Sequence, residues 1–192
     1  MLDWDERYIT EKTLHVAGTG SFSNNLDNTA VTDNGDGTVT VAATGHGYKE
    51  GSQVYIEGTT NYDGLHALTA VATNSITFAA TYVAETPAGG GAETVGIVLY
   101  PEDTFKLVGF YLHLNAASAT SEDFAIAIDS GDGTYYDTKI FALDMNGQAD
   151  VKRKYNKNEA ERRDSDDKLR FTWTNTNGKT YGLEIRYQVP QA

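Results

Sequence analysis

The sequence predicts an all-β protein built from two parts. Apolar side chains alternate with a period of two, for example at Phe124, Ile126 and Ile128 and again along 181–189, which places each set on one face of a sheet. Helix signals are nearly absent, since the one candidate, residues 158–167, lacks an apolar stripe. We therefore expect an eight-stranded, jelly-roll-like antiparallel sandwich that carries a small five-stranded, β-barrel-like insert.

The strands are expected where apolar and polar side chains alternate between turn-forming residues. In the sandwich they fall at residues 13–17, 94–100, 105–115, 123–129, 137–143, 150–155, 168–175 and 180–189. In the insert they fall near residues 29–32, 38–43, 53–57, 66–71 and 75–80. Within 105–115 the alternation changes face at Gly109, which predicts a β-bulge there.

Two glycine-containing stretches mark the expected boundaries of the insert. PAGGG, residues 87–91, has almost no side chain to pack and indicates a flexible join, and GTGSFSNN, residues 18–25, indicates a weaker one. We accordingly predict an N-terminal arm and the first sandwich strand over 1–22, the inserted β-domain over 23–93 and the rest of the β-sandwich over 94–192. The alternative is two sequential domains preceded by an N-terminal arm.

Composition narrows the classes of function. The chain has 192 residues, no cysteine and a formal net charge of −12, so disulfides, thiolate metal sites and cysteine nucleophiles are excluded. No apolar run approaches the roughly 20 residues of a membrane span, and the N-terminus lacks the pattern of a signal peptide, so we expect no membrane partner. The acidic charge also argues against a nucleic-acid partner, because such binding depends on basic contacts with phosphates.

The basic residues are concentrated in one segment. Residues 152–170 hold 8 of the 15 basic and 5 of the 27 acidic residues, which leaves 7 basic against 22 acidic residues, a charge of −15, elsewhere. One interpretation is a solvated loop of mixed charge. The other is a contact surface for an acidic neighbour, including a second copy of this chain, with Lys152, Arg153 and Lys154 as partner-binding residues.

The first ten residues form a charged arm that contains apolar side chains. Leu2, Trp4, Tyr8 and Ile9 are set among charged residues, and an exposed apolar group on such an arm is stabilised by docking on a partner. We therefore predict these four residues as partner-binding. The alternative is a frayed terminus.

Two aspartate-rich loops, residues 32–40 and 129–137, could offer oxygen ligands to calcium. Neither completes an EF-hand, and each lies between two predicted strands, where Asn-Gly and Asp-Gly are typical of tight hairpin turns. Hairpin turns are therefore the preferred interpretation. The candidate metal ligands are Asp129, Asp132 and Asp137, because the longer loop could bring them together.

No catalytic motif is apparent. The four histidines, at positions 15, 46, 66 and 113, form no close ligand pair, and the chain has neither a Gly-x-Ser-x-Gly elbow nor a phosphate-cradling loop. We predict that the protein is not an enzyme and has no cofactor; the alternative is a hydrolase whose residues converge only in the fold. His46, between two glycines, is predicted to anchor a turn by hydrogen bonds to the backbone.

The aromatic residues divide into core and surface candidates. Trp173 shares the apolar face of its strand with Leu169 and Phe171, which predicts a core position. Tyr135 and Tyr136 lie in a predicted loop and are candidates for carbohydrate or protein contact, because an exposed aromatic ring can stack on a sugar.

Two sets of residues resemble structural proteins of tailed bacteriophages. Residues 45–64 have a Gly-His-Gly turn before a strand and an Asn-Tyr-Asp-Gly turn before the next, and resemble a small β-module of such proteins; Ser52 stands where that module usually has an aspartate. The second set is similar to β-sandwich domains of phage virion proteins. It comprises residues 112–115, 120–124, 128–129, 136–138 and 175–183.

This resemblance implies a non-enzymatic virion structural protein that is assembled in the host cytoplasm. It implies a capsid decoration or cementing protein, or a head-fibre subunit, that binds the major capsid protein or other virion proteins and self-associates, with a trimer favoured. The alternative is a tail, baseplate or receptor-binding protein with a carbohydrate-binding β-sandwich. No catalytic residue carries over, because the family pattern consists of turns.

Overall fold

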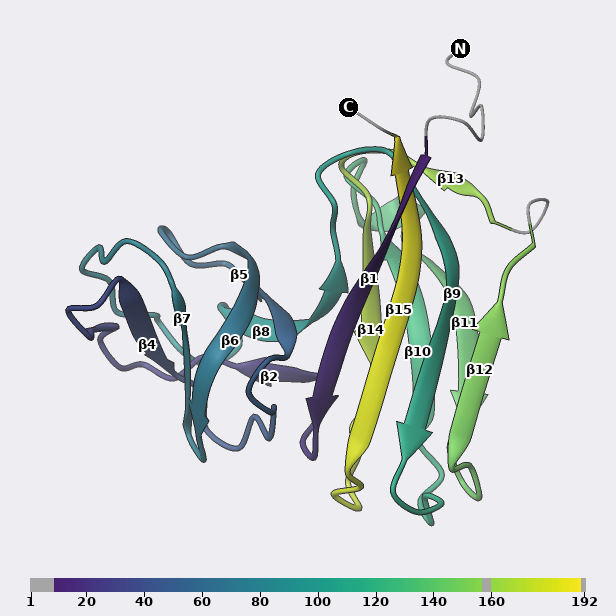
Figure 1. The fold of residues 1–192 in the computed structure, drawn as a ribbon, viewed down its shortest axis with the longest axis horizontal. Coiled ribbons are helices and arrows are strands. Elements are labelled where there is room, and N and C mark those ends of the chain that lie inside the picture. Colours follow the sequence, from purple (N-terminus) through teal and green to yellow (C-terminus); the bar gives the residue numbers. More distant parts are fainter. Residues whose placement is uncertain (1–8, 157–159, 191–192) are drawn as a thin grey trace.

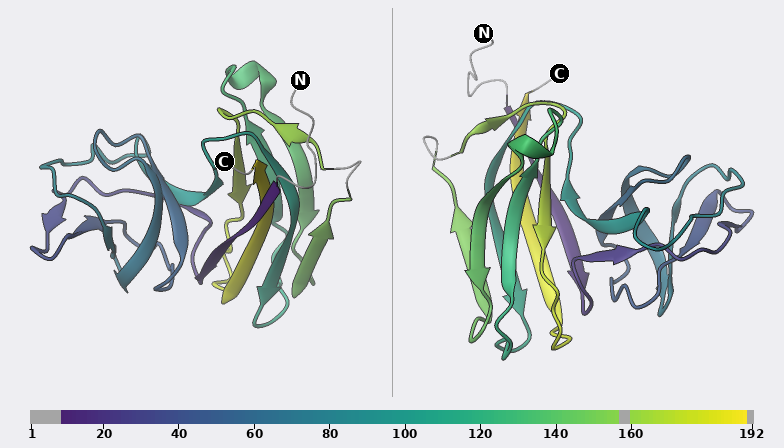
Figure 2. Two further views of the ribbon diagram at one scale, coloured as in Figure 1. Left: turned by 45° about the horizontal axis from the view of Figure 1, so that its top comes forward. Right: turned by 180° about the vertical axis from the view of Figure 1, so that it is seen from behind.

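The computed structural model describes residues 9–156 and 160–190 and has two lobes side by side (Figure 1). The larger lobe is a β-sandwich, and the smaller lobe is formed by the chain between strands β1 (Ile9–Gly18) and β8 (Thr94–Leu99). The other views in Figure 2 show the smaller lobe on one flank of the sandwich. The prediction of an all-β, antiparallel sandwich is confirmed.

Within the described residues the sandwich contains eight principal strands. They are β1 (Ile9–Gly18), β8 (Thr94–Leu99), β9 (Phe105–Leu114), β10 (Asp123–Asp129), β11 (Thr138–Asp144), β12 (Asp150–Lys154), β14 (Lys168–Thr172) and β15 (Tyr181–Pro190). Six have bounds within one residue of the prediction, whereas β1 begins at Ile9 instead of residue 13 and β14 ends at Thr172 instead of residue 175. The short strand β13 (Arg162–Arg163) also pairs with β9, and a 3-10 turn, η2 (Thr134–Tyr136), precedes β11.

These strands form two four-stranded sheets in jelly-roll order. One sheet has the order β1-β15-β9-β12, and the other has the order β11-β10-β14-β8. When the eight sandwich strands are renumbered from 1 to 8 in chain order, the two sheets have the strand orders 1-8-3-6 and 5-4-7-2. This is the strand arrangement of a jelly roll. The predicted bulge is confirmed, because Arg186 faces Gly109 whereas Tyr187 faces Leu107, which leaves Val108 unpaired.

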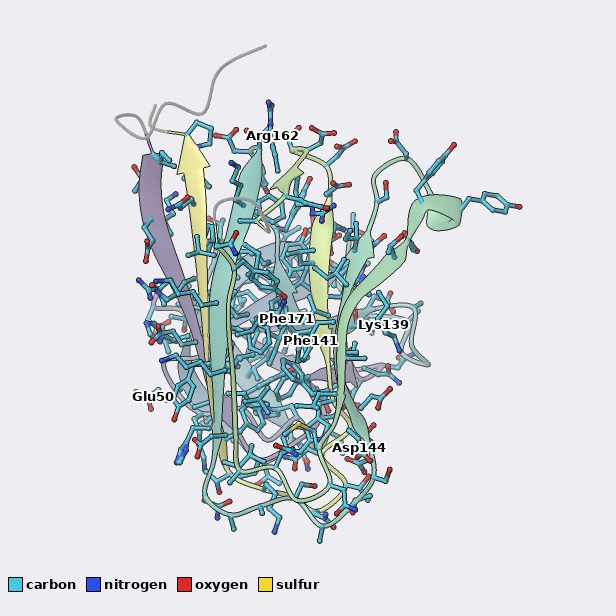
Figure 3. The ribbon with its side chains drawn as sticks, turned by 90° about the vertical axis from the view of Figure 1, so that its right-hand side faces the viewer. Glu50, Lys139, Phe141, Asp144, Arg162 and Phe171 are labelled. Carbon is cyan, nitrogen blue, oxygen red and sulfur yellow. The ribbon has the colours of Figure 1, made fainter. Side chains whose placement is uncertain are left out.

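The core of the sandwich is an aromatic cluster between the two sheets. Figure 3 shows side chains such as Phe141 and Phe171 filling this space, with Lys139 and Asp144 on the outside. Phe22 is fully buried and packs edge-on against Phe124 and Trp173, at ring-centroid distances of 5.9 and 5.6 Å. The predicted core position of Trp173 is confirmed by its 2% exposure.

The insert continues one sheet of the sandwich. Its strands are β2 (Ser23–Asn25), β3 (Thr32–Asp33), β4 (Thr38–Ala42), β5 (Gln53–Glu57), β6 (Gly64–Ala72) and β7 (Ser75–Ala79). The order β8-β5-β6-β7-β4-β3 extends the sandwich sheet, and β2 lies on the other side of β8. The prediction of a barrel-like insert is therefore wrong: among the described residues its sheet stays open, because β3 ends the sheet and pairs with β4 alone.

Strand β8 is the joint between the lobes. Its first half, Thr94–Gly96, pairs with β5 and β2 of the insert, whereas residues 97–99 pair with β14 of the sandwich. The sheet is thus continuous across the boundary. The 87–91 join is also tied to the insert, since Ala88 donates its N–H to Glu93 and accepts a hydrogen bond from Asn28.

The first expected strand of the insert differs from the structure. Residues 29–31 are not a strand, although Val31 is buried; its N–H donates to the carbonyl of Glu85, which lies in an irregular segment. The apolar residue is buried as its pattern suggests, but its backbone partner comes from a distant loop rather than from a strand.

Within the described residues, no helix has the length and apolarity needed to cross a membrane.

Candidate functional site

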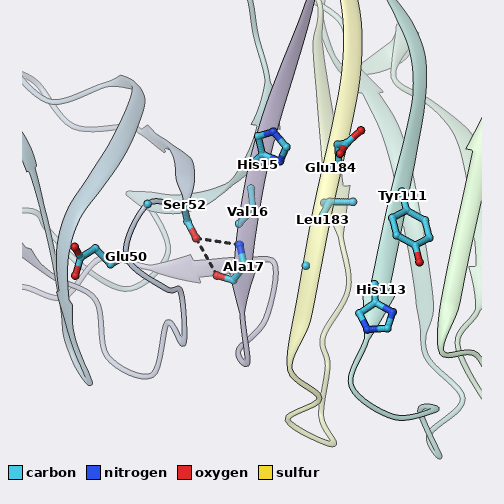
Figure 4. Close-up of a pocket in the computed structure, with 11 residues that line it drawn as sticks. His15, Val16, Ala17, Glu50, Ser52, Tyr111, His113, Leu183 and Glu184 are labelled. Atoms are coloured by element: carbon cyan, nitrogen blue, oxygen red, sulfur yellow. Dashed lines mark hydrogen bonds between the residues drawn. The ribbon is translucent and has the colours of Figure 1, made fainter.

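The candidate site is a hollow on the outer face of the β1-β15-β9 sheet, next to the insert (Figure 4). It has a volume of about 390 Å³. We call it the Gly182 hollow, because Gly182 lies on its floor. Its lining residues are His15, Val16, Ala17, Glu50, Gly51, Ser52, Tyr111, His113, Gly182, Leu183 and Glu184.

Strand alternation decides which side chains reach this hollow. On β9, Leu112 and Leu114 are buried in the sandwich, so Tyr111 and His113 point outward, and Tyr111 is 41% exposed. Gly182 lies opposite both Ala17 and His113 in the register of the sheet. In this row across the three strands, Ala17 has a small side chain and Gly182 has none. The hollow lies above these two residues.

Asp150, on β12, orients the two rings at one side of the hollow. Its Oδ1 accepts a hydrogen bond from the Tyr111 hydroxyl at 2.8 Å, and His113 Nδ1 lies 2.7 Å from the same oxygen. The rings lie side by side, with centroids 6.4 Å apart and planes 23° apart. The hydrogen bond from His113 lowers the pKa of Asp150 most, and the hydrogen bond from Tyr111 lowers it further. The hydrogen bond to Asp150 in turn raises the pKa of Tyr111.

The opposite wall is held in place by Ser52 of the insert, which is only 3% exposed. Its Oγ donates to the Ala17 carbonyl at 2.9 Å and accepts from the Ala17 N–H at 3.0 Å (Figure 4). Gln53 Oε1 accepts from the His15 N–H. Side chains of the insert thus satisfy the edge of β1, which would otherwise present unpaired backbone groups.

A second hollow of about 320 Å³ lies beside the first on the same face and shares Tyr111 and Glu184 with it. Its lining includes Lys152, Arg153, Lys154 and Arg186. The structure therefore places the three predicted basic contact residues on edge strand β12, at the end of the molecule away from the insert (Figure 1).

The other predicted partner-binding residues were expected in an N-terminal arm. Leu2, Trp4 and Tyr8 lie outside the described residues. Ile9 is the first described residue, and its assignment to the arm is wrong: it begins β1 and faces Pro190 of β15.

The predicted sugar-contact tyrosines lie together, outside the lining of either hollow. Tyr135 is 99% exposed and Tyr136 is 66% exposed on the 3-10 turn η2. No hydrogen bond to either side chain is found among the described residues, so the turn presents two largely exposed rings.

The candidate calcium ligands are not brought together. Asp129 Oδ2 accepts a hydrogen bond from Arg170 Nε at 2.7 Å, whereas Asp137 Oδ1 accepts one from the Ser130 N–H. Asp132 lies at the loop tip, where its own N–H donates to Ser130. Across residues 9–156 and 160–190, no group of three or more His, Asp or Glu side chains could hold a metal ion. Asp129 forms an ion pair instead, because Arg170, which faces Ala127 in the register, is its diagonal neighbour on β14.

The prediction for His46 is confirmed. Its ring is 1% exposed; Nδ1 accepts from the Tyr48 N–H at 3.0 Å, and Nε2 lies 2.8 Å from the Ala72 carbonyl. These roles require the Nε2–H tautomer. His66 Nε2 likewise contacts the Tyr62 carbonyl. His46 and His66 are therefore structural, and neither lines the hollow that contains His15 and His113.

An ion-pair cluster joins the two lobes on the sheet that contains β10, β14 and β8, which is the sheet opposite the one that carries the two hollows. Glu57 of the insert contacts Lys168 Nζ at 2.5 Å and an Arg170 guanidinium nitrogen at 2.6 Å, and Arg170 also pairs with Asp129. Lys168 lies over the rings of Tyr55 and Tyr100, at 5.4 and 5.3 Å from their centroids. We call Glu57, Asp129, Lys168 and Arg170 the lobe clamp.

The lobe clamp predicts a pH-dependent contribution to stability. Burial alone would raise the pKa of Glu57, but hydrogen bonds from Lys168 and Arg170 outweigh it and hold the pKa below its ordinary value of 4.5. A lowered folded-state pKa means that this stability is present above pH 4.5 and is lost as the pH falls through the folded-state pKa. We expect Glu57→Gln to cost about 1–2 kcal/mol at pH 7.

Urea denaturation of both proteins at pH 7 and pH 3 measures this contribution. The difference between parent and Glu57→Gln should shrink between pH 7 and pH 3, because the stability that comes from the lowered pKa of Glu57 is lost as its carboxylate becomes protonated. A difference of the same size at both pH values would contradict the lobe clamp as its source.

Comparison with known proteins finds no relative: no family model matches the chain, and no curated protein and no solved structure matches it. The function therefore has to be inferred from the residues themselves. Sequence reasoning missed the Gly182 hollow, although one signal was present: Gly182 interrupts the strand-forming residues of 181–189 on their outward face.

Proposed function

We propose that this chain is a non-enzymatic structural component of a tailed-phage virion, a capsid decoration or head-fibre subunit that binds the capsid surface and self-associates. The observation that carries the proposal is the separation of charge between the two ends of the molecule. Residues 23–93 contain one basic residue, Lys49, and eight acidic ones, a charge of −7. Strand β12, which carries Lys152, Arg153 and Lys154, lies at the opposite end (Figure 1), whereas Lys168 and Arg170 of the same basic segment pair with Glu57 of the insert.

This separation favours association between the acidic insert of one copy and the basic edge of the next. Such a contact joins two different surfaces, so it produces a closed ring when the rotation between copies closes, and a filament when it does not. A trimer is the smallest ring of this kind. The rigid joint supports the proposal as well, because the shared strand β8 and the lobe clamp set the direction in which the insert projects from the sandwich.

Self-association should depend on salt and on the basic edge strand. We expect the chain to sediment as an oligomer at about 50 mM salt and to dissociate at about 500 mM, because exposed charges are screened within a few ångströms at high salt. Lys152→Glu/Lys154→Glu should prevent assembly. Sedimentation velocity measures both effects, and the same runs with capsids of the encoding phage should show co-sedimentation of the parent.

Lys139→Glu/Lys179→Glu is the matched control, since it changes the net charge equally at lysines outside the basic segment. A parent that stays monomeric at every salt concentration, or equal effects of the two double variants, would refute the proposed contact. Failure to co-sediment with capsids would refute the virion role.

A tail or receptor-binding protein that binds carbohydrate through its sandwich is the second candidate. The pair Tyr135 and Tyr136 favours it, because two rings that are mostly exposed to water are available for contact. Loss of glycan binding in Tyr135→Ala or Tyr136→Ala would support this candidate at that turn, and unchanged binding would remove the turn from consideration.

A further inference from the structure

We propose that the Gly182 hollow is a saccharide-binding site that accepts one pyranose ring between the rings of Tyr111 and His113 and the insert wall at Ser52. This inference goes beyond the proposed structural role, because a subunit that only joins neighbours in a particle needs no such site. It also places sugar binding on a different surface from Tyr135 and Tyr136. The hollow has the size of ordinary small-molecule sites, which span about 300–1,000 Å³.

The glycine on the floor is the first feature that points to a ligand. Gly182 lies in β15, a central strand between β1 and β9, where glycine is disfavoured because it has no side chain to pack against its neighbours. Nothing in the fold requires it: its φ lies outside the left-handed region, and a Cβ there would meet no heavy atom within 4 Å. Glycine in a strand often marks a place where a ligand approaches the backbone closely.

Gly109, on the neighbouring strand, shows what a structurally required glycine looks like. A Cβ at that position would lie 2.5 Å from the Arg153 carbonyl oxygen. Glycine is needed there for close approach of β12 at the bulge. Gly182 has no comparable constraint, so the open space above it is the property that distinguishes it.

The pair of oriented rings is the second such feature. Tyr111 and His113 are exposed on the same side of β9, yet both are hydrogen-bonded to one oxygen of Asp150. This contact limits their rotamer freedom before any ligand binds, and preorganised aromatic groups lose less entropy on binding. Asp150 is therefore a positioning residue, and the rings supply a flat apolar surface.

The polar groups around that surface define the class of ligand. Glu184 and His15 lie opposite each other in register on β15 and β1, and both line the hollow with the two rings. A carboxylate accepts hydrogen bonds, whereas imidazole and phenol groups donate or accept them. A ligand must therefore have an apolar face and a rim of hydroxyl groups, and a pyranose ring has both. A purely apolar ligand would leave these polar groups without partners.

Binding of methyl glycosides to the full chain, followed by protein NMR, tests the site. The probes are methyl glycosides of glucose, galactose, mannose, N-acetylglucosamine, N-acetylgalactosamine, rhamnose and glucuronic acid. At least one should shift the Gly182 and His113 amide signals saturably, with a Kd below about 10 mM. Gly182→Tyr, whose side chain fills the hollow without a backbone clash, should abolish binding and leave the chain folded.

Further variants distinguish binding in the hollow from binding elsewhere on the surface. Tyr111→Ala should weaken binding roughly ten-fold, through loss of the aromatic surface, and it keeps the test valid if Gly182→Tyr fails to fold. Tyr136→Ala, which removes an exposed tyrosine on the η2 turn, should bind as the parent does. Absence of saturable binding by any glycoside, or binding that persists in both hollow variants, would overturn the proposal. Neither result bears on self-association, which is measured without sugar.

Discussion

Replacing Gly47 by alanine is expected to destabilise the protein by about 3–5 kcal/mol, as the sum of a left-handed backbone cost and a steric clash. Gly47 has a φ of +66°, and a Cβ there would lie 2.3 Å from the backbone nitrogen of Gly20. The contact joins the turn after His46 to the segment that enters the insert. Its backbone cannot move aside, because the Gly47 carbonyl accepts a hydrogen bond from the Thr19 N–H.

Gly45→Ala is the matched control on the other side of His46. Gly45 has a similar φ of +71°, but a Cβ there would meet nothing within 4 Å. Its alanine variant should lose only the left-handed backbone cost, about 1–2 kcal/mol. Urea denaturation of the two variants compares them directly, and equal losses would show that close approach to Gly20 does not determine the choice of glycine.

Phe22→Ala is expected to cost about 3–5 kcal/mol, the usual range for removing a buried phenylalanine. Phe22 is fully buried and contacts Phe124, Trp173 and Tyr181 by its ring. It also tethers the backbone at the lobe boundary, because its N–H donates to the Trp173 carbonyl and its own carbonyl accepts from the Ile97 N–H. The cavity would therefore open where the two lobes meet.

Chemical denaturation with tyrosine and tryptophan fluorescence measures this loss. Tyr136→Ala, at a 66% exposed position, is the control and should change the free energy of unfolding by less than about 0.5 kcal/mol. A loss below about 1 kcal/mol for Phe22→Ala would mean that residues 18–25 form the loose join that their composition suggests.

Strands with one buried face were predictable because burial has a period of two along them. The bounds of β10, Asp123–Asp129, coincide with the prediction, and the bulge at Gly109 was visible as a change of face. Residues 18–25 were not predictable in the same way. Their glycines, serines and asparagines suggest a join between domains. The segment is nevertheless part of the core, because burying the apolar surface of the single residue Phe22 stabilises it there.

The candidate functional residues likewise divide into those that the sequence predicted correctly and those that it did not. The turn role of His46 followed from its two flanking glycines, and the hydrogen bonds confirm it. Asp129 was predicted as a metal ligand from its loop, but its partner is Arg170, 41 residues away in the chain. The Gly182 hollow combines β1, β9, β15 and the insert, so no short segment of the sequence contains its pattern.

The sequence by itself determined that this chain is an antiparallel β-protein, because alternation, β-forming residues and turn-forming glycines are local properties. Only the tertiary structure decided that β8 is shared by the two lobes, that Asp129 belongs to an ion-pair cluster and that Tyr111, His113 and Gly182 surround one hollow. The physical reason is that strand pairing in a jelly roll joins residues distant in the chain. Which outward-facing side chains become neighbours therefore depends on the order of strands in the sheet.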